Sequence, residues 1–207
     1  MIVYETQALD SDSAYKLISA TVTPRPIAWV SSLNAAGGVN LAPFSSYTFI
    51  SYSPPKVLIS IGPGTDKLKD TLVNADARGE FCVSSVTPDF LKVMANSSFA
   101  YENTESEATE LGIDLVPARL IETPFVAGAA VAMECRVDRI VEVGDDDRHR
   151  LIIGTVVCFH IDEAIWQGDR IDPVAYQALG RIGGPLYVTR GEILKMAAPR
   201  APAGSEA

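Results

Sequence analysis

Cysteine and histidine are scarce in this sequence, which leaves little material for a metal site. The 207 residues include 3 cysteines and 2 histidines. The cysteines, Cys82, Cys135 and Cys158, form no Cys-x-x-Cys pair, the spacing that structural zinc sites commonly use. Their odd number and the apolar neighbours of Cys82 and Cys158 predict free, buried thiols in a reducing compartment. We therefore expect neither a metal site nor a disulfide framework.

Positive charge and long apolar runs are scarce as well. Lysine and arginine total 17 against 26 acidic residues, which gives a formal net charge of −9. A surface for nucleic acid or anionic lipid needs clustered positive charge, so we expect neither partner. No apolar run approaches the roughly 20 residues that span a bilayer. The N-terminal sequence lacks the basic and apolar regions of a signal peptide, which predicts a cytoplasmic protein.

The signatures of several common catalytic sites are absent. The sequence contains no Gly-x4-Gly-Lys-Ser/Thr, no His-Glu-x-x-His and no Gly-x-Ser-x-Gly. Gly62-Pro-Gly64 does not begin a Rossmann fingerprint, because Lys67 stands where the third glycine is required. These absences argue against the classical hydrolases and nucleoside triphosphatases.

The length and composition that remain are typical of one globular domain. Hydrophobic residues make up 47% of the chain and charged residues 21%, which argues against wholesale disorder. We expect a single domain over residues 1–196. Residues 197–207, rich in alanine and proline, have little to pack and are expected to form a disordered tail.

Short strand patterns separated by glycine and proline dominate the sequence. Residues 131–143 and 149–161, joined by Gly144-Asp-Asp-Asp147, predict a long antiparallel hairpin. Both faces of its second arm are apolar, so both must be covered, as in a barrel whose outside meets a helix or a second subunit. The sequence therefore predicts a mainly β protein, a barrel with peripheral helices. Other strands are expected over 27–33, 39–51, 56–61 and 80–86, helices over 13–20, 66–78 and 88–96, and an exposed helical insertion over 103–111.

Three polar segments are candidates for a ligand site. Hydroxyls and amides in residues 24–32 and 40–47 suit the edge of a flat polar heterocycle, although serines on an edge strand can equally face solvent. Lys69 and Thr71, near a helix N-terminus, can hold a phosphate or simply form a solvated helix face. His149 follows an acidic turn, where a histidine is more often a surface or core residue than a catalytic one.

Several strings share their order and spacing with one known family. They are Arg25-Pro-Ile-Ala-Trp-Val-Ser-Ser32, Gly38-Val-Asn-Leu-Ala-Pro-Phe-Ser45, Pro54-Pro55, Lys69-Asp-Thr71 ahead of Phe81-Cys-Val83, Ile153-Gly-Thr-Val156 and Arg181-Ile-Gly-Gly-Pro-Leu-Tyr187. With them the chain resembles the flavin reductase-like, FMN-binding split-barrel family, from residue 23 to residue 187. The resemblance implies a homodimer of split β-barrels with noncovalent FMN near the interface. For many members it also implies reduction of flavin by NADH or NADPH.

The resemblance also implies which residues form the site. His149 lies where family members often place a histidine near the nicotinamide, although Asp147-Arg148 replaces the glycine and acid that usually precede it. The implied cofactor contacts are Ser31, Asn40, Ala42, Pro43, Ser45 and Ser46 for the ring and ribityl chain, and Lys69 and Thr71 for the phosphate, with Ser60 beside them.

The resulting functional hypothesis is an oxidoreductase that passes hydride from NAD(P)H to FMN and could supply reduced flavin to a partner monooxygenase. The alternative is a noncatalytic FMN-binding electron carrier that does not use NAD(P)H, and a fold relative without flavin is a third possibility. His149 and His160 have opposite parity along a regular strand, so we expect at most one of them to meet the nicotinamide. We favour His149, because the resemblance marks that position and its neighbours are polar. His160 is expected in the core, bonded to a backbone carbonyl.

Overall fold

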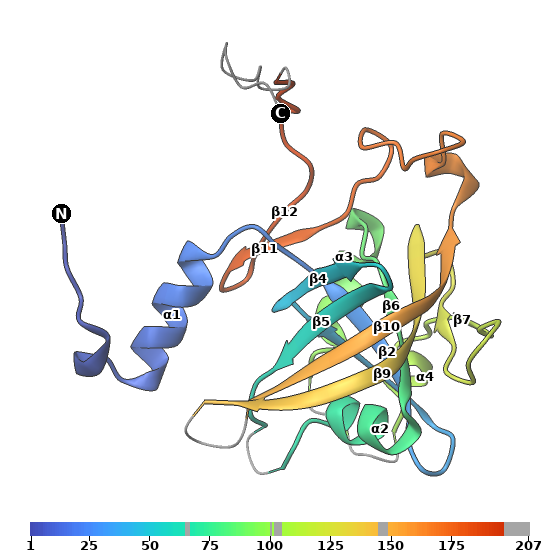
Figure 1. Ribbon diagram of the computed structural model, residues 1–207, viewed down its shortest axis with the longest axis horizontal. Helices are drawn as coiled ribbons and strands as arrows, with labels where there is room; N and C mark the ends of the chain where they lie inside the picture. Colours follow the sequence, from blue (N-terminus) through green and yellow to red (C-terminus); the bar gives the residue numbers. More distant parts are fainter. Residues whose placement is uncertain (65–66, 100, 102–104, 145–148, 197–207) are drawn as a thin grey trace, which may run out of the picture.

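The protein is described by a computed structural model that covers residues 1–64, 67–99, 101, 105–144 and 149–196. Its centre is a strongly curved antiparallel sheet of seven strands in the order β3-β2-β6-β9-β10-β5-β4 (Figure 1). The two edge strands follow one another in the chain, separated only by Ser45 and Ser46, so the sheet must curl to bring its edges together. The strands are β2 (Ala28–Leu33), β3 (Val39–Phe44), β4 (Tyr47–Tyr52), β5 (Pro55–Ile61), β6 (Glu80–Ser84), β9 (Val131–Val143) and β10 (His149–Ile161).

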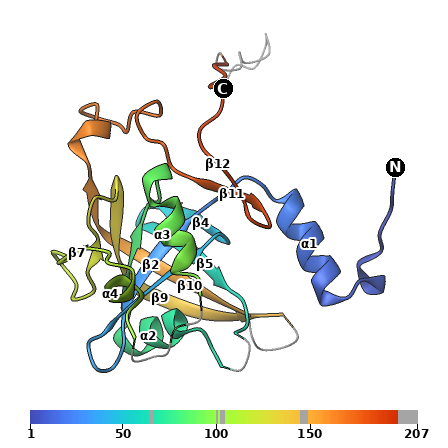
Figure 2. The same ribbon diagram turned by 180° about the vertical axis from the view of Figure 1, so that it is seen from behind.

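Helices and small sheets surround this barrel. Helix α2 (Asp70–Arg78) lies at one end of it, and α3 (Leu91–Asn96) crosses the face seen from behind (Figure 2). Helix α1 (Ser11–Thr21) stands away from the barrel and has no buried residue. The remaining elements are β1 (Arg25–Pro26), β11 (Gly180–Gly183) and β12 (Leu186–Val188) in one sheet, β7 (Leu115–Val116) and β8 (Phe125–Val126) in another, α4 (Glu107–Glu110), and the 3-10 turns Thr6–Ala8, Pro88–Phe90 and Glu163–Ile165.

Strand β2 divides two hydrophobic cores. Successive side chains of a strand point to opposite faces. Ala28 and Val30 accordingly join the barrel interior, while Trp29 packs outside it with Leu41 and Met94. All six residues of β2 are therefore buried. The Trp29 indole Nε1–H donates to Ser97 Oγ at 2.9 Å, so the polar end of this buried ring is satisfied.

The long hairpin predicted over residues 131–143 and 149–161 is confirmed with those bounds as β9 and β10. The predicted strand over 39–51 is wrong as one element, because the chain breaks at Ser45 and Ser46 between β3 and β4. The aspartates of the predicted turn, residues 145–147, lie outside the described residues, and so does the predicted tail over residues 197–207.

The predicted helices differ from the structure at their N-termini. The first begins at Ser11, where the Asp10 carboxylate accepts the Ser13 N–H at 2.7 Å. The second begins at Asp70 instead of residue 66, with Lys69 as N-cap, and ends as predicted at Gly79, which takes a φ of 70°. That left-handed conformation is one that glycine adopts readily. The third predicted helix, over 88–96, is a 3-10 turn followed by α3.

The predicted exposed insertion over 103–111 is corrected for its described part. Helix α4 spans only Glu107–Glu110, and Glu107 and Ala108 are buried. They are buried because α4 packs beside β3, an edge strand whose outer N–H row has no neighbouring strand. Leu41 N–H donates instead to the Glu107 carboxylate at 2.8 Å.

The three cysteines are free, as the sequence predicted. Cys82 and Cys135 are buried as predicted, but the prediction of burial is wrong for Cys158, which is partly exposed. Burial raises the pKa of the Cys82 and Cys135 thiols, which keeps both protonated at neutral pH. Within the described part of the chain, none of the helices has the length and apolar character needed to cross a bilayer.

Candidate functional site

Two neighbouring cavities lie along β3 and share Phe44 as a lining residue. The first is lined by β3, by the segment that leads into α2, and by the residues that follow α3. The second lies between the β3–β4 connection, α1, α3 and the β11–β12 hairpin. Phe44 and Ser98 line both. Of the residues predicted from the sequence, Asn40, Ala42, Lys69 and Thr71 line the first cavity, and Pro43 and Ser45 line the second.

A hydrogen-bonded network fixes the polar wall of the first cavity. Asn40 Nδ2–H donates to Thr71 Oγ1 at 2.9 Å and is 3.4 Å from Ser32 Oγ. Asn74 Nδ2–H also donates to Ser32 Oγ, at 3.2 Å. The network links β2 and β3 to the first turns of α2. It therefore holds the N-terminus of α2 against the edge of the sheet.

The charged residues of this cavity are mixed in sign. Lys67 and Lys69 line it together with Asp70 and Glu107, and Lys67 Nζ lies 3.2 Å from Asp70 Oδ1. Burial raises the pKa of the Glu107 carboxyl, the Leu41 N–H opposes this, and the Asp70 charge adds to it. The pKa of Glu107 therefore lies above that of a surface glutamate.

The donors of the first cavity fit a phosphate group. Thr71 Oγ1 accepts a hydrogen bond from Asn40, so the hydroxyl proton is directed to a further acceptor. The first N–H groups of a helix have no partner within the helix, and its N-terminus carries partial positive charge. Lys69 adds an exposed ammonium at this point. Charge, hydroxyl and helix N-terminus together are the chemistry that binds phosphate.

The approach to α2 requires a glycine. A Cβ atom added at Gly64 would lie 2.1 Å from the Lys67 carbonyl oxygen. A residue with a side chain at position 64 would therefore collide with the backbone of Lys67. Gly64 and Lys67 both line the first cavity.

Of the other predicted site residues, Ser31 lies apart from the two cavities. Its hydroxyl donates to the Pro124 carbonyl at 2.5 Å, and the side chain is fully buried. In the register of β2 and β3, Ser31 pairs with Leu41 and Ser32 pairs with Asn40. Strand alternation therefore directs Ser32 to the polar network and Ser31 to the opposite face. A role for Ser31 in cofactor binding stays a prediction.

Ser46, Ser60 and His149 line neither of these cavities. Ser60 N–H donates to the Ser46 carbonyl at 2.7 Å, which joins the start of β4 to the end of β5. His149 begins β10, and a Cβ atom added at Gly62 would lie 3.5 Å from its Nε2. His149 thus lies next to the segment that leads into the first cavity.

His160 is bonded to a carboxylate and not to the backbone carbonyl that we expected. Its Nε2 lies 2.6 Å from Glu134 Oε1, and its ring stacks near Phe125. The register of β9 and β10 shifts twice between the two histidines, so the parity argument made from a regular strand does not hold. Distance still separates them, since eleven residues of strand extend roughly 36 Å.

Glu134 is the centre of this second polar cluster. It is fully buried, and its two oxygens accept the backbone N–H groups of Arg119 and Leu120, each at 2.7 Å. Burial acts to raise the pKa of the Glu134 carboxyl, but the Arg119 N–H, His160 and the Leu120 N–H together outweigh it and the pKa is lowered. The carboxylate therefore fastens the 119–120 loop to the hairpin.

Sequence reasoning missed several residues in and behind the cavity walls. It did not assign a role to Ser32, which bonds Asn40 and Asn74 behind the wall of the first cavity, because only the strand register distinguishes Ser32 from Ser31. Arg181 and Tyr187 belong to a string that carried the resemblance, but neither was assigned a role. Glu107 lay in a polar segment that gave no sign of burial.

Comparison with known proteins agrees with this architecture. The flavin reductase like domain matches residues 20–180, more than half of the chain, and the chain belongs to this family. Its fold is the split β-barrel that the resemblance implied.

Individual relatives cover nearly the whole chain. YwrF of Bacillus subtilis (strain 168) is 32% identical over 204 residues, which covers 96% of this chain and 100% of YwrF. Nitrilotriacetate monooxygenase component B from Bacillus cereus has a TM-score of 0.91 at 28% identity, covering 95% of this chain and 98% of that one. The Pseudomonas fluorescens 2-nitrobenzoate 2-nitroreductase NbaA has a TM-score of 0.88 at 29% identity, covering 98% and 100% of the two chains.

The two histidines are expected to respond differently to replacement by alanine. His149→Ala should raise the KM for NAD(P)H by about tenfold, the value of one hydrogen bond to a charged group, and leave FMN affinity and the thermal midpoint nearly unchanged. His160→Ala should mainly lower the thermal midpoint, because it removes a partner of buried Glu134. Steady-state kinetics and thermal unfolding measure both. Unchanged kinetics in His149→Ala together with lost NAD(P)H oxidation in His160→Ala would reverse the assignment.

Proposed function

We propose that the protein binds FMN noncovalently along β3 and reduces it with NADH or NADPH. The observation that carries the proposal is the position of Thr71 and Lys69 at the N-terminus of α2, held against β3 by the Asn40 hydrogen bond. This arrangement would provide a phosphate site at one end of β3, where the small residue Ala42 leaves room along the cavity wall. Membership in the flavin reductase-like family supports the same cofactor.

The chain's own residues would bind and orient the cofactor. Lys69, Thr71 and the first N–H groups of α2 would hold the phosphate, while Asn40 keeps the Thr71 hydroxyl oriented toward it. Pro43 and Ser45, in the second cavity, would adjoin the ring. A bound flavin accepts hydride by its own chemistry, so the protein needs no acid–base residue for that step.

The reduced flavin could then serve a partner monooxygenase. One relative is component B of nitrilotriacetate monooxygenase from Bacillus cereus, and we propose that the present chain supplies reduced flavin to a monooxygenase. The competing proposal is an electron carrier that binds FMN but does not use NAD(P)H. The same cavity would serve both functions, so kinetics must distinguish them.

Mixing the FMN-loaded protein with NADH or NADPH without oxygen tests the proposal. A reductase should lose its visible flavin absorbance rapidly with at least one of the two nucleotides. A flavin that stays oxidised with both nucleotides, yet is reduced by dithionite, would contradict the reductase and favour the carrier.

We also propose a homodimer. Strand β4 is an edge strand, and it exposes Phe49, Ile50 and Tyr52 to 74%, 45% and 91%. Phe159 of β10 is 51% exposed as well. Exposed aromatic and aliphatic side chains on these two strands of one sheet, which are separated by β5, suit an interaction surface. A second copy of the chain would cover them.

The expected interface is large, about 2,000 Å² or more, as in obligate dimers. Light scattering should therefore give a dimer mass at micromolar concentration. Tyr52→Lys together with Phe49→Lys should shift the protein toward the monomer, whereas Lys92→Glu on the exposed side of α3 should not. A monomer mass for the wild-type protein would contradict the proposal.

A further inference from the structure

The second cavity contains a cation that the proposed FMN contacts do not use. Arg181 of β11 and Tyr187 of β12 line it together with Tyr15, Pro43, Phe44 and Ser45. The guanidinium lies over the Tyr187 ring, 4.5 Å from its centroid, and donates to the Tyr187 hydroxyl. The aromatic ring thus fixes the guanidinium plane at the cavity wall.

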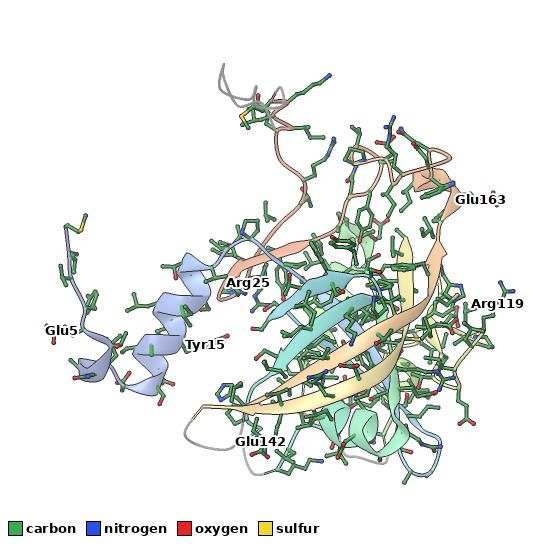
Figure 3. The ribbon with its side chains drawn as sticks, viewed as in Figure 1. Glu5, Tyr15, Arg25, Arg119, Glu142 and Glu163 are labelled. Carbon is green, nitrogen blue, oxygen red and sulfur yellow. The ribbon has the colours of Figure 1, made fainter. Side chains whose placement is uncertain are left out.

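A second arginine lies directly opposite the first. In the pairing of β1 with β11, Arg25 is the partner of Arg181, and like charges in such a pair are destabilising. Arg25 Nη1 donates to the carbonyls of Ser19 and, at 2.7 Å, Val22, so its side chain is turned to the C-terminus of α1. Figure 3 shows Arg25 where the chain passes from α1 to the barrel.

Neither arginine has an acidic partner within the described part of the chain. The ion pairs found there all involve other residues. This is notable in a chain with 26 acidic and 17 basic residues, where carboxylates are in excess. Arg181 is partly buried, and its guanidinium has five N–H donors, of which Tyr187 takes one. The remaining donors can bind an oxyanion bidentately.

We propose that the Arg181 cavity binds the anionic group of the second redox substrate, a carboxylate or phosphate carried on a planar molecule. The cavity adjoins Pro43 and Ser45, the residues assigned to the flavin ring, so a molecule anchored at Arg181 lies beside the ring. Tyr15 and Phe44 supply aromatic surface for its planar part. The inference rests on the proposed function, which requires a second substrate. The oxyanion belongs either to an aromatic acid that accepts electrons or to the phosphates of the nicotinamide dinucleotide.

Calorimetric titration of the FMN-loaded protein, without turnover, tests the proposal. The probes are benzoate, its uncharged analogue benzamide, and inorganic pyrophosphate. Arg181→Gln should lower the affinity for the anion that the wild type binds by about tenfold or more, the usual effect of losing a charge-assisted hydrogen bond. The affinity for benzamide should stay unchanged. The matched control is Arg170→Gln, which removes an equal charge from a loop where the Arg170 side chain is 72% exposed.

The pattern of losses identifies the source of the oxyanion. If Arg181→Gln loses affinity for benzoate and keeps its KM for NADH and NADPH, the cavity is assigned to an aromatic acid. If it loses affinity for pyrophosphate and its KM for the nucleotides rises, the cavity is assigned to the dinucleotide. If neither nucleotide reduces the flavin of the wild-type protein but the binding of benzoate or pyrophosphate still depends on Arg181, the proposed function fails and the anion site stands.

Two results would overturn the inference. The first is equal binding of both anions to Arg181→Gln and Arg170→Gln. The second is a loss of FMN affinity in Arg181→Gln as large as the loss of anion affinity, which would assign the cavity to the flavin itself. Should Arg181→Gln fail to fold, benzoate and benzamide are compared in the wild type and in Arg181→Lys. Equal affinity for the two compounds in both proteins would also overturn the inference.

Discussion

Glu134→Ala is expected to lower the free energy of unfolding by about 3–5 kcal/mol, the usual cost of removing one partner from a buried charged network. The substitution leaves the N–H groups of Arg119 and Leu120 without their acceptor and removes the partner of His160. It also leaves a cavity in the hairpin. Denaturant unfolding measures the change.

Glu142→Ala on the same hairpin is the matched control. Glu142 pairs with Arg150, but its side chain is 64% exposed, so the change should be no more than about 1 kcal/mol. Equal losses in the two variants would show that the Glu134 network contributes no more than a surface ion pair.

The pH dependence of stability should carry the same signature. The pKa of Glu134 is lower in the folded protein than its ordinary value of 4.5. Its contribution is therefore fully present above pH 4.5 and is lost as the pH falls through the folded pKa. Glu134→Gln should flatten this acid limb of the stability profile while changing little in its slope above pH 6.

Lys69→Ala is expected to weaken FMN binding by about 10–150-fold, because a charge-assisted hydrogen bond to phosphate contributes roughly 1.5–3 kcal/mol. Riboflavin lacks the phosphate, so its affinity should hardly change. Titration of both flavins against wild type and variant, followed by flavin fluorescence, measures the difference.

Lys92→Ala provides the control, since Lys92 is an exposed lysine of α3 that lines neither cavity. It should leave both flavins unaffected. Equal losses of FMN and riboflavin in Lys69→Ala would mean that Lys69 is a helix-face charge and that the phosphate lies elsewhere.

The long hairpin could be predicted from the sequence because its information is local. Both arms are rich in apolar residues, and a glycine and three aspartates stand between them. The break between β3 and β4 could not be predicted this way, because Ser45 and Ser46 are as compatible with a strand as with a bend. The curl of the sheet, which depends on pairing between distant segments, decides where the chain turns.

For the candidate site, too, features set by local sequence could be predicted, and features set by pairing between distant segments could not. The position of Lys69 and Thr71 at a helix N-terminus could be predicted because the signals for a helix start are local, and their contact with a phosphate stays a prediction. The choice between Ser31 and Ser32 could not, since it depends on the register in which β2 meets Asn40. Glu134 gave no signal at all, because its partners Arg119 and Leu120 are 15 and 14 residues away and contribute only backbone groups.

The central claim is that the cavity between β3 and α2 holds FMN. Reconstitution of the purified protein with FMN and with riboflavin, followed by removal of free flavin and measurement of the bound fraction, tests it most directly. The account predicts saturable uptake of FMN, weaker uptake of riboflavin, and loss of this difference in Lys69→Ala. A wild-type protein that remains colourless after reconstitution would contradict it.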